Sequence, residues 1–173
     1  MKSVLKYCFL VLGAMLVAAA SIHSAAAMEL TRVYYPNQAN MAFTVDVPSH
    51  WEMTPQDSDA GFFEVEGPFG LELSFRLVPA GDVKAAIEDH VRYLKAHFTE
   101  VTMAPAEPKS VNGLEAVVLP GTGVDEFGSD RELGAGWFKL PDGRIGEAWY
   151  SVDVTDKAGR AEALAVLRSL KGS

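Results

Sequence analysis

The order of two hydrophobic periodicities along the chain constrains its fold more than any other feature of the sequence. Apolar and polar side chains alternate over residues 42–47 and again over 71–78, which is the period of a strand with one buried face. Residues 83–98 then carry apolar side chains at helical spacing, and Asp82 stands where an N-cap is expected. With a further strand predicted over 61–66, the first half is interpreted as strands followed by one amphipathic helix.

The second half of the chain repeats this order. Asn112 and Gly113 form the dipeptide most typical of a two-residue hairpin, because a type I′ turn needs two positive φ angles. The expected elements after it are a strand over 114–119, a glycine-rich acidic loop over 120–134, paired strands over 135–140 and 144–153, and a helix over 156–170. Thr155 is expected to cap this helix, and its buried side is expected to carry Leu164, Leu167 and Leu170.

Hairpin signals dominate, so the sequence predicts an α+β fold with a mostly antiparallel β-sheet and two packed helices. No linker rich in serine, glycine or proline divides the chain. We therefore expect one domain over residues 41–173, preceded by a polar lead-in over 28–40. Residues 33–35 within the lead-in are expected to form a short edge strand.

The first 27 residues have the layout of a secretory signal peptide. Lys2 and Lys6 precede an apolar run, and the segment ends in a small-x-small site at Ala25 and Ala27. Cleavage is expected before Met28, which would place the mature protein in the periplasm or outside the cell, with no stable membrane insertion. The alternative is an uncleaved anchor, because a spanning helix needs about 20 apolar residues.

Charge and cysteine content exclude several classes of function. The chain has 15 Lys and Arg against 23 Asp and Glu, a formal net charge of −8 that cleavage would take to −10. Such a surface repels nucleic acid and anionic headgroups, so no nucleic-acid partner is expected. Cys8, the only cysteine, would leave with the signal peptide, which excludes thiol catalysis, iron–sulfur clusters and c-type haem attachment in the mature chain.

Four motifs in a fixed order resemble the PsbP-like fold group, which includes the Ran-binding Mog proteins and the DcrB-type bacterial periplasmic proteins. They are a strand ending in a Pro-x-x-Trp turn (43–51), the Asn-Gly hairpin (111–116), an aromatic strand (148–152) and a terminal helix closing on residues 166–170. The resemblance spans nearly all of residues 40–171 and implies an α/β/α sandwich. It also implies a non-enzymatic binding or assembly module, and it transfers no catalytic or cofactor-binding residue.

The acidic loop is the first candidate for an interaction surface. It places an apolar side chain among charged ones, and long loops on rigid scaffolds often carry function. The candidate residues are Asp125, Glu126, Phe127, Asp130 and Arg131, together with Trp51. A calcium site is the alternative for the carboxylates, although their spacing does not match an EF-hand loop.

No catalytic or metal-binding motif stands out. His90 and His97 lie seven residues apart on the predicted helix, which is too far for an i, i+4 metal pair, and His50 is expected to be exposed. Trp149 is expected in the core. For Trp51 and Trp137 the sequence does not distinguish core packing from the lining of a ligand groove. We expect no cofactor, no metal site and no catalytic residues.

The sequence favours a binding or accessory module that contacts another envelope protein, which predicts an exposed apolar patch. A carrier of a small molecule or metal ion is the alternative, and it predicts a deep pocket with a few convergent polar groups. A hydrolase, the least favoured hypothesis, requires a nucleophile within hydrogen-bond reach of a base.

Overall fold

The computed structural model describes residues 29–54, 61–79 and 82–173, so the predicted cleavage site at Ala25, Ala27 and Met28 lies outside the described residues. The elements in chain order are β1 (Leu30–Tyr35), β2 (Phe43–Pro48), β3 (Glu52–Met53), β4 (Phe62–Glu66), the 3-10 turn η1 (Pro68–Gly70), β5 (Glu72–Leu77), α1 (Val83–His97), β6 (Thr99–Met103), β7 (Glu107–Val111), β8 (Leu114–Val124), β9 (Asp130–Lys139), β10 (Ile145–Asp153), α2 (Lys157–Ser169) and β11 (Lys171–Gly172).

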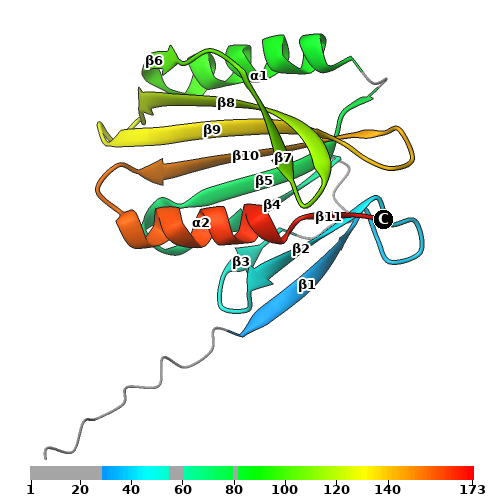
Figure 1. The fold of residues 1–173 in the computed structure, drawn as a ribbon. Coiled ribbons are helices and arrows are strands. Elements are labelled where there is room, and N and C mark those ends of the chain that lie inside the picture. The colour runs from blue at the N-terminus through cyan, green and yellow to red at the C-terminus, as the bar shows by residue number, and fades with distance from the viewer. Residues whose placement is uncertain (1–28, 55–60, 80–81) are drawn as a thin grey trace, which may run out of the picture.

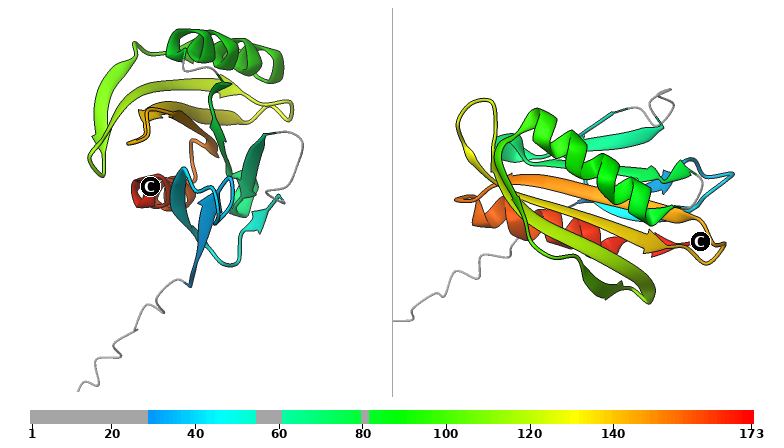
Figure 2. Two further views of the ribbon diagram at one scale, coloured as in Figure 1. Left: turned by 90° about the vertical axis from the view of Figure 1, so that its right-hand side faces the viewer. Right: turned by 90° about the horizontal axis from the view of Figure 1, so that it is seen from above.

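Two antiparallel sheets and two helices form three layers. The large sheet has eight strands in the order β3-β4-β5-β10-β9-β8-β6, with β7 paired to β8, and the small sheet has the order β1-β2-β11. Helix α1 covers one face of the large sheet, while α2 and the small sheet lie on the other (Figures 1 and 2). The predicted α+β fold with a mostly antiparallel sheet and two packed helices is confirmed.

The main core lies between the large sheet and the layer formed by α2 and the small sheet. Four phenylalanine rings from β2, β4, β5 and β9 pack there, and the rings of Phe63 and Phe75 stack with centroids 4.8 Å apart. A smaller core beneath α1 contains Trp137 and Trp149. Trp51 packs in the main core, so the tryptophans that the sequence left open are both buried.

The helix termini follow capping chemistry, with one correction. The Asp82 carboxylate accepts hydrogen bonds from the backbone N–H groups of Lys84 and Ala85, as predicted. At α2 the prediction of Thr155 is wrong, because Asp156 is the N-cap and accepts from the N–H of Gly159. The Thr155 hydroxyl instead donates to Asp153 at 2.6 Å.

The buried face of α2 also differs from the predicted stripe. Its fully buried residues are Gly159, Ala163 and Val166, followed by Leu170 just past the helix. Leu164 and Leu167 are only half-buried. The helix therefore presents small residues to the sheet and leaves two leucines at the edge of the contact.

The Asn-Gly hairpin is confirmed. Asn112 and Gly113 have φ angles of 50° and 83°, as a type I′ turn requires. The Asn112 side chain also donates to the carbonyls of Arg168 and Leu170 at 2.6 and 2.7 Å. The turn between β7 and β8 is thereby attached to the C-terminal end of α2.

The predicted glycine-rich loop over 120–134 is wrong, because most of it is strand. β8 continues to Val124 and β9 begins at Asp130, which leaves a turn of five residues. Glycine is required here by close approach: a Cβ at Gly121 would lie 2.7 Å from the Thr102 carbonyl oxygen, and one at Gly134 would lie 2.2 Å from the Tyr150 ring. These glycines let β6 and Tyr150 pack directly on the backbone.

The lead-in is more ordered than the sequence suggests. The edge strand predicted at residues 33–35 exists, but β1 begins at Leu30 and pairs with β2 over six residues. Val33 and Tyr35 are buried in the main core. Pro108 lies within β7, whose other edge is unpaired among the described strands, where proline is tolerated.

Candidate functional site

The structure divides the predicted surface residues into two groups. Phe127, at the tip of the β8–β9 turn, is 84% exposed, and Asp125, Glu126 and Asp130 lie beside it in the same turn. In contrast, Trp51 is 4% exposed and Arg131 is 7% exposed. Neither buried side chain can contact a partner directly, so these two residues are removed from the predicted surface.

Arg131 instead braces the turns that carry the exposed residues. Its Nε donates to the Ser151 hydroxyl at 3.0 Å, and its Nη2 donates to the Gly70 carbonyl. Its Nη1 lies 3.8 Å from an oxygen of Asp125. One buried guanidinium therefore connects β10, η1 and the β8–β9 turn.

The β8–β9 turn is itself closed by a local network. The Asp125 carboxylate accepts from the backbone N–H groups of Phe127 and Ser129, and the Asp125 carbonyl accepts from Gly128, which has a φ of 81°. Such side-chain to backbone bonds rigidify a short turn. Phe127 is thus held outward by a fixed backbone.

A second phenylalanine is presented on η1, beside the same brace. Phe69 is 84% exposed and has φ 57° and ψ 32°, a left-handed conformation that is uncommon for a bulky residue. Val154, which is also exposed, donates its N–H to the Asp130 carbonyl. We name Phe69, Phe127 and Val154 the phenylalanine end; Figure 1 shows the β8–β9 turn and the β10–α2 connection at the same edge of the molecule.

Carboxylates surround the phenylalanine end. Asp125, Glu126 and Asp130 lie in or beside the β8–β9 turn, and Glu72 follows η1. Burial raises the pKa of Glu72, Arg131 lowers it, and the carboxylates of Glu64, Glu66 and, least of all, Asp125 raise it further. The exposed aromatic side chains of the phenylalanine end therefore lie among negatively charged groups.

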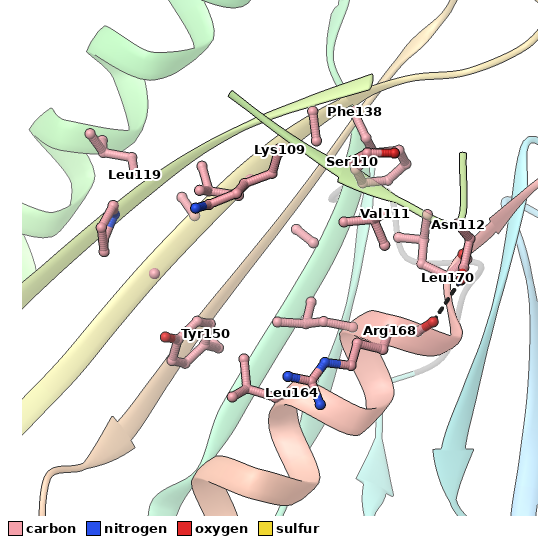
Figure 3. A pocket seen from close by; sticks show the side chains of 18 residues that line it. Lys109, Ser110, Val111, Asn112, Leu119, Phe138, Tyr150, Leu164, Arg168 and Leu170 are labelled. Atoms are coloured by element: carbon pink, nitrogen blue, oxygen red, sulfur yellow. Dashed lines mark hydrogen bonds between the residues drawn. The ribbon is translucent and has the colours of Figure 1, made fainter. Parts of the chain in front are cut away.

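A long apolar groove separates the large sheet from α2, a feature that the sequence analysis did not locate. Its volume is about 550 Å³. The floor is formed by small residues on one face of β8, β9 and β10, and the wall by Leu164 and Leu167 of α2. Figure 3 shows Leu164 on the α2 side of the groove. The small floor residues are Ala116, Gly134, Gly136 and Ala148. The alternation of Gly134 and Gly136 along β9 was the available signal, but the loop interpretation of 120–134 placed Gly134 outside the strand.

The rim of the groove carries two cationic side chains. Lys109 from β7 and Arg168 from α2 line it from opposite sides (Figure 3). The Lys109 ammonium also lies 2.7 Å from Glu107, whereas the Arg168 guanidinium makes no ion pair within the described part of the chain. The Tyr150 ring lines the groove, and its hydroxyl donates to Glu132, which also accepts from Arg160.

A charged cluster lies on the opposite face of the sheet, beneath α1. Glu147 is 1% exposed; one of its oxygens accepts from Arg76 at 2.9 Å, and the other lies 3.4 Å from Nδ1 of His90. Burial alone would raise the pKa of Glu147, but the hydrogen bonds and charges of His90 and Arg76 together lower it. His90 is buried, while His50 and His97 are exposed.

The contacts of this cluster are those of a buried ion-pair network. Ser74 lines the same small cavity as His90, but no hydrogen bond joins the two in residues 29–54, 61–79 and 82–173. The carboxylate is occupied by Arg76 and His90, so the group reads as a structural ion pair. A search of the same described residues finds no group of three or more His, Cys, Asp or Glu that could hold a metal ion.

Within the described residues, no helix has the length and hydrophobicity that crossing a membrane requires. No family model matches the sequence, and a search of curated proteins also finds no match.

Solved structures do match this fold. The solution structure of cyanobacterial PsbP (CyanoP) from Synechocystis sp. PCC 6803 aligns with a TM-score of 0.57 at 13% identity, covering 90% of this chain and 99% of that one. The Ran-binding protein Mog1p of Saccharomyces cerevisiae aligns with a TM-score of 0.52 at 15% identity, covering 84% and 96%. With its curved antiparallel sheet between α1 and α2, this protein has the PsbP/Mog1-like fold.

Proposed function

We propose that the protein is an exported, non-catalytic accessory module that binds a partner protein of the cell envelope through the phenylalanine end. The observation that carries this proposal is the pair of phenylalanines, each 84% exposed, on two turns that one buried arginine connects. Exposing two aromatic rings to water is unfavourable unless a partner covers them. Rigid presentation reduces the entropy that binding would otherwise cost.

The chemistry of the phenylalanine end also defines the partner. Carboxylates of the β8–β9 turn surround the apolar centre, and interfaces pair opposite potentials around a desolvated core. The partner is therefore expected to offer an apolar cleft with a basic rim. Complex formation is expected to slow as ionic strength rises, because salt screens charges at the rim.

The fold similarity supports this role without assigning a partner. One structure of the same fold is described as a Ran-binding protein, so the fold is compatible with protein recognition. The function itself depends on the site.

The test is photo-crosslinking from the phenylalanine end in the cells that produce the protein. A photoreactive residue at position 127 is expected to capture one partner, and the same residue at position 30, another exposed apolar position, is expected not to. With the purified pair, Phe69→Asn together with Phe127→Ser is expected to weaken binding by about 30-fold or more, as for two central aromatic contacts. Asparagine suits position 69 because it tolerates a left-handed backbone.

The matched control is Leu30→Ser, which removes an exposed apolar side chain from β1 and is expected to leave the dissociation constant unchanged. Equal affinity of the double variant and the unaltered protein would refute the phenylalanine end as the interface. Export is tested separately by the intact mass of the protein from its native source. A mass that begins at Met28 supports cleavage after Ala27, and a mass that includes residues 1–27 refutes it.

A further inference from the structure

The apolar groove between the sheet and α2 has a chemistry that the proposed protein interface does not use. The groove lies on the face of β8, β9 and β10 that is turned toward α2. The phenylalanine end lies instead on η1, the β8–β9 turn and the β10–α2 connection. We infer that the groove binds a long-chain fatty acid, with the acyl chain along the small-residue floor and the carboxylate between Lys109 and Arg168.

The groove is hollow because of side-chain size. Alternate residues of β8, β9 and β10 face α2, and at four of these positions the side chain is alanine or absent. At Gly136 an added Cβ would make only ordinary contacts, the nearest at 3.5 Å from Val118 Cγ1, so this glycine leaves room for at least one more carbon atom on the floor. Leu164 and Leu167 remain half-buried across from it. A volume of about 550 Å³ lies within the range of small-molecule sites.

The charges at the rim select an anion. The chain carries an excess of eight acidic groups, yet the two charged side chains that line this groove are both cationic. Arg168 also has a free guanidinium within the described part of the chain, and a carboxylate matches its paired donors. A cationic or a neutral amphiphile would form no ion pair with these two side chains.

Two further polar groups of the lining already have partners within the protein. The Asn112 amide donates to two carbonyls at the end of α2, and the Tyr150 hydroxyl donates to Glu132. Most of the remaining lining is apolar, so it favours an acyl chain over a polar metabolite. A single chain suits a groove that is long and lined by one layer of small residues.

The experiment measures binding of laurate to the purified protein by isothermal titration calorimetry, below micelle-forming concentrations. The probes for comparison are dodecyl maltoside, which is neutral, and dodecyltrimethylammonium, which is cationic; all three share the same chain length. Laurate is expected to bind with one-to-one stoichiometry and more tightly than either comparison probe. Tighter or equal binding of dodecyl maltoside would overturn the assignment of an anionic ligand.

Two variants test the two parts of the site. Lys109→Gln with Arg168→Gln is expected to weaken laurate binding about 3- to 30-fold, the effect of two partly exposed charge contacts, and to leave dodecyl maltoside unchanged. Lys84→Gln with Lys95→Gln makes the same change of charge on α1, on the other face of the sheet, and is expected to have no effect.

Gly136→Val fills the groove and is expected to abolish binding of every probe. Valine is favoured in strands, and the Cβ contact of 3.5 Å is ordinary, so the fold should persist. If Gly136→Val unfolds, the charge variants still decide the question, because they alter only the rim. No laurate binding to the unaltered protein would overturn the inference, as would a dimer that Gly136→Val dissociates, since a second copy would then occupy the groove.

Discussion

Replacing Arg131 with methionine should destabilise the protein strongly and release both turns of the phenylalanine end. The substitution keeps an unbranched apolar stem and removes three polar contacts: those to Ser151, Gly70 and Asp125. Ser151 is 1% exposed, so its hydroxyl would remain buried without this partner, which costs about 1–3 kcal/mol. The Gly70 carbonyl is more exposed and can be rehydrated, which adds about 1 kcal/mol.

Removing a buried charge also saves its desolvation energy, which offsets part of this loss. The free energy of unfolding should therefore fall by about 1–3 kcal/mol, and the melting temperature by about 3–9 °C for a domain of this size. Urea denaturation measures the first quantity and scanning calorimetry the second. Amide hydrogen exchange at residues 69–70 and 125–129 should accelerate more than exchange in α1, because the brace is local.

Two comparison variants make the reasoning refutable. Arg131→Lys keeps the charge but cannot donate to Ser151 and Gly70 at once, so its stability should fall between those of the methionine variant and the unaltered protein. Arg32→Met removes the exposed ion pair with Asp46 and should cause a much smaller change. A loss below about 0.5 kcal/mol for Arg131→Met, the level of an ordinary surface substitution, would show that Arg131 does not brace the two turns.

Three further measurements address other parts of the fold. Because the pKa of Glu147 is lowered in the folded protein, the unfolded chain binds the Glu147 proton more readily. The contribution of Glu147 to stability is therefore present above the ordinary glutamate pKa and is lost as pH falls through the folded pKa. Urea midpoints measured below pH 5 should accordingly show a flatter pH dependence for Glu147→Gln. Asn112→Asp should destabilise more than Asn112→Gly in thermal unfolding, because its carboxylate would face the Arg168 and Leu170 carbonyls while glycine only loses the two donors. Tyr150→Phe should lower the free energy of unfolding by about 1–2 kcal/mol in urea, because Glu132 keeps its bond to Arg160.

Local signals predicted the fold class well because each depends on neighbouring residues alone. The Asn112-Gly113 turn and the Asp82 cap follow from backbone conformations that few residues adopt. The glycines of residues 120–134 were misinterpreted because their cause is distant in sequence. Gly121 and Gly134 admit β6 and the Tyr150 ring, and no local pattern distinguishes such glycines from those of a loop.

The same difference between local and distant causes explains which residues of the candidate site the sequence predicted. Phe127 was selected because it stands among acidic residues in a predicted loop, but Phe69 lies between two predicted strands and was not singled out. Arg131 was placed on the surface, as a charged residue in a polar segment usually is. Its burial depends on β10 and η1 lying beside β9, which the order of strands in the sheet determines.

The β8–β9 hairpin contributes to both proposed sites, which makes their independence testable. Gly136 lies in the strand that forms the groove floor, and Phe127 lies in the turn at its end. Energies of well-separated residues without shared partners usually add, so Gly136→Val should change the affinity for the partner protein less than about twofold. Phe69→Asn with Phe127→Ser should likewise leave laurate binding unchanged. If laurate alters partner affinity in the unaltered protein, the same factor must appear in the reciprocal experiment; the two sites would then be coupled through the hairpin, and the two proposals would describe a single ligand-controlled interface.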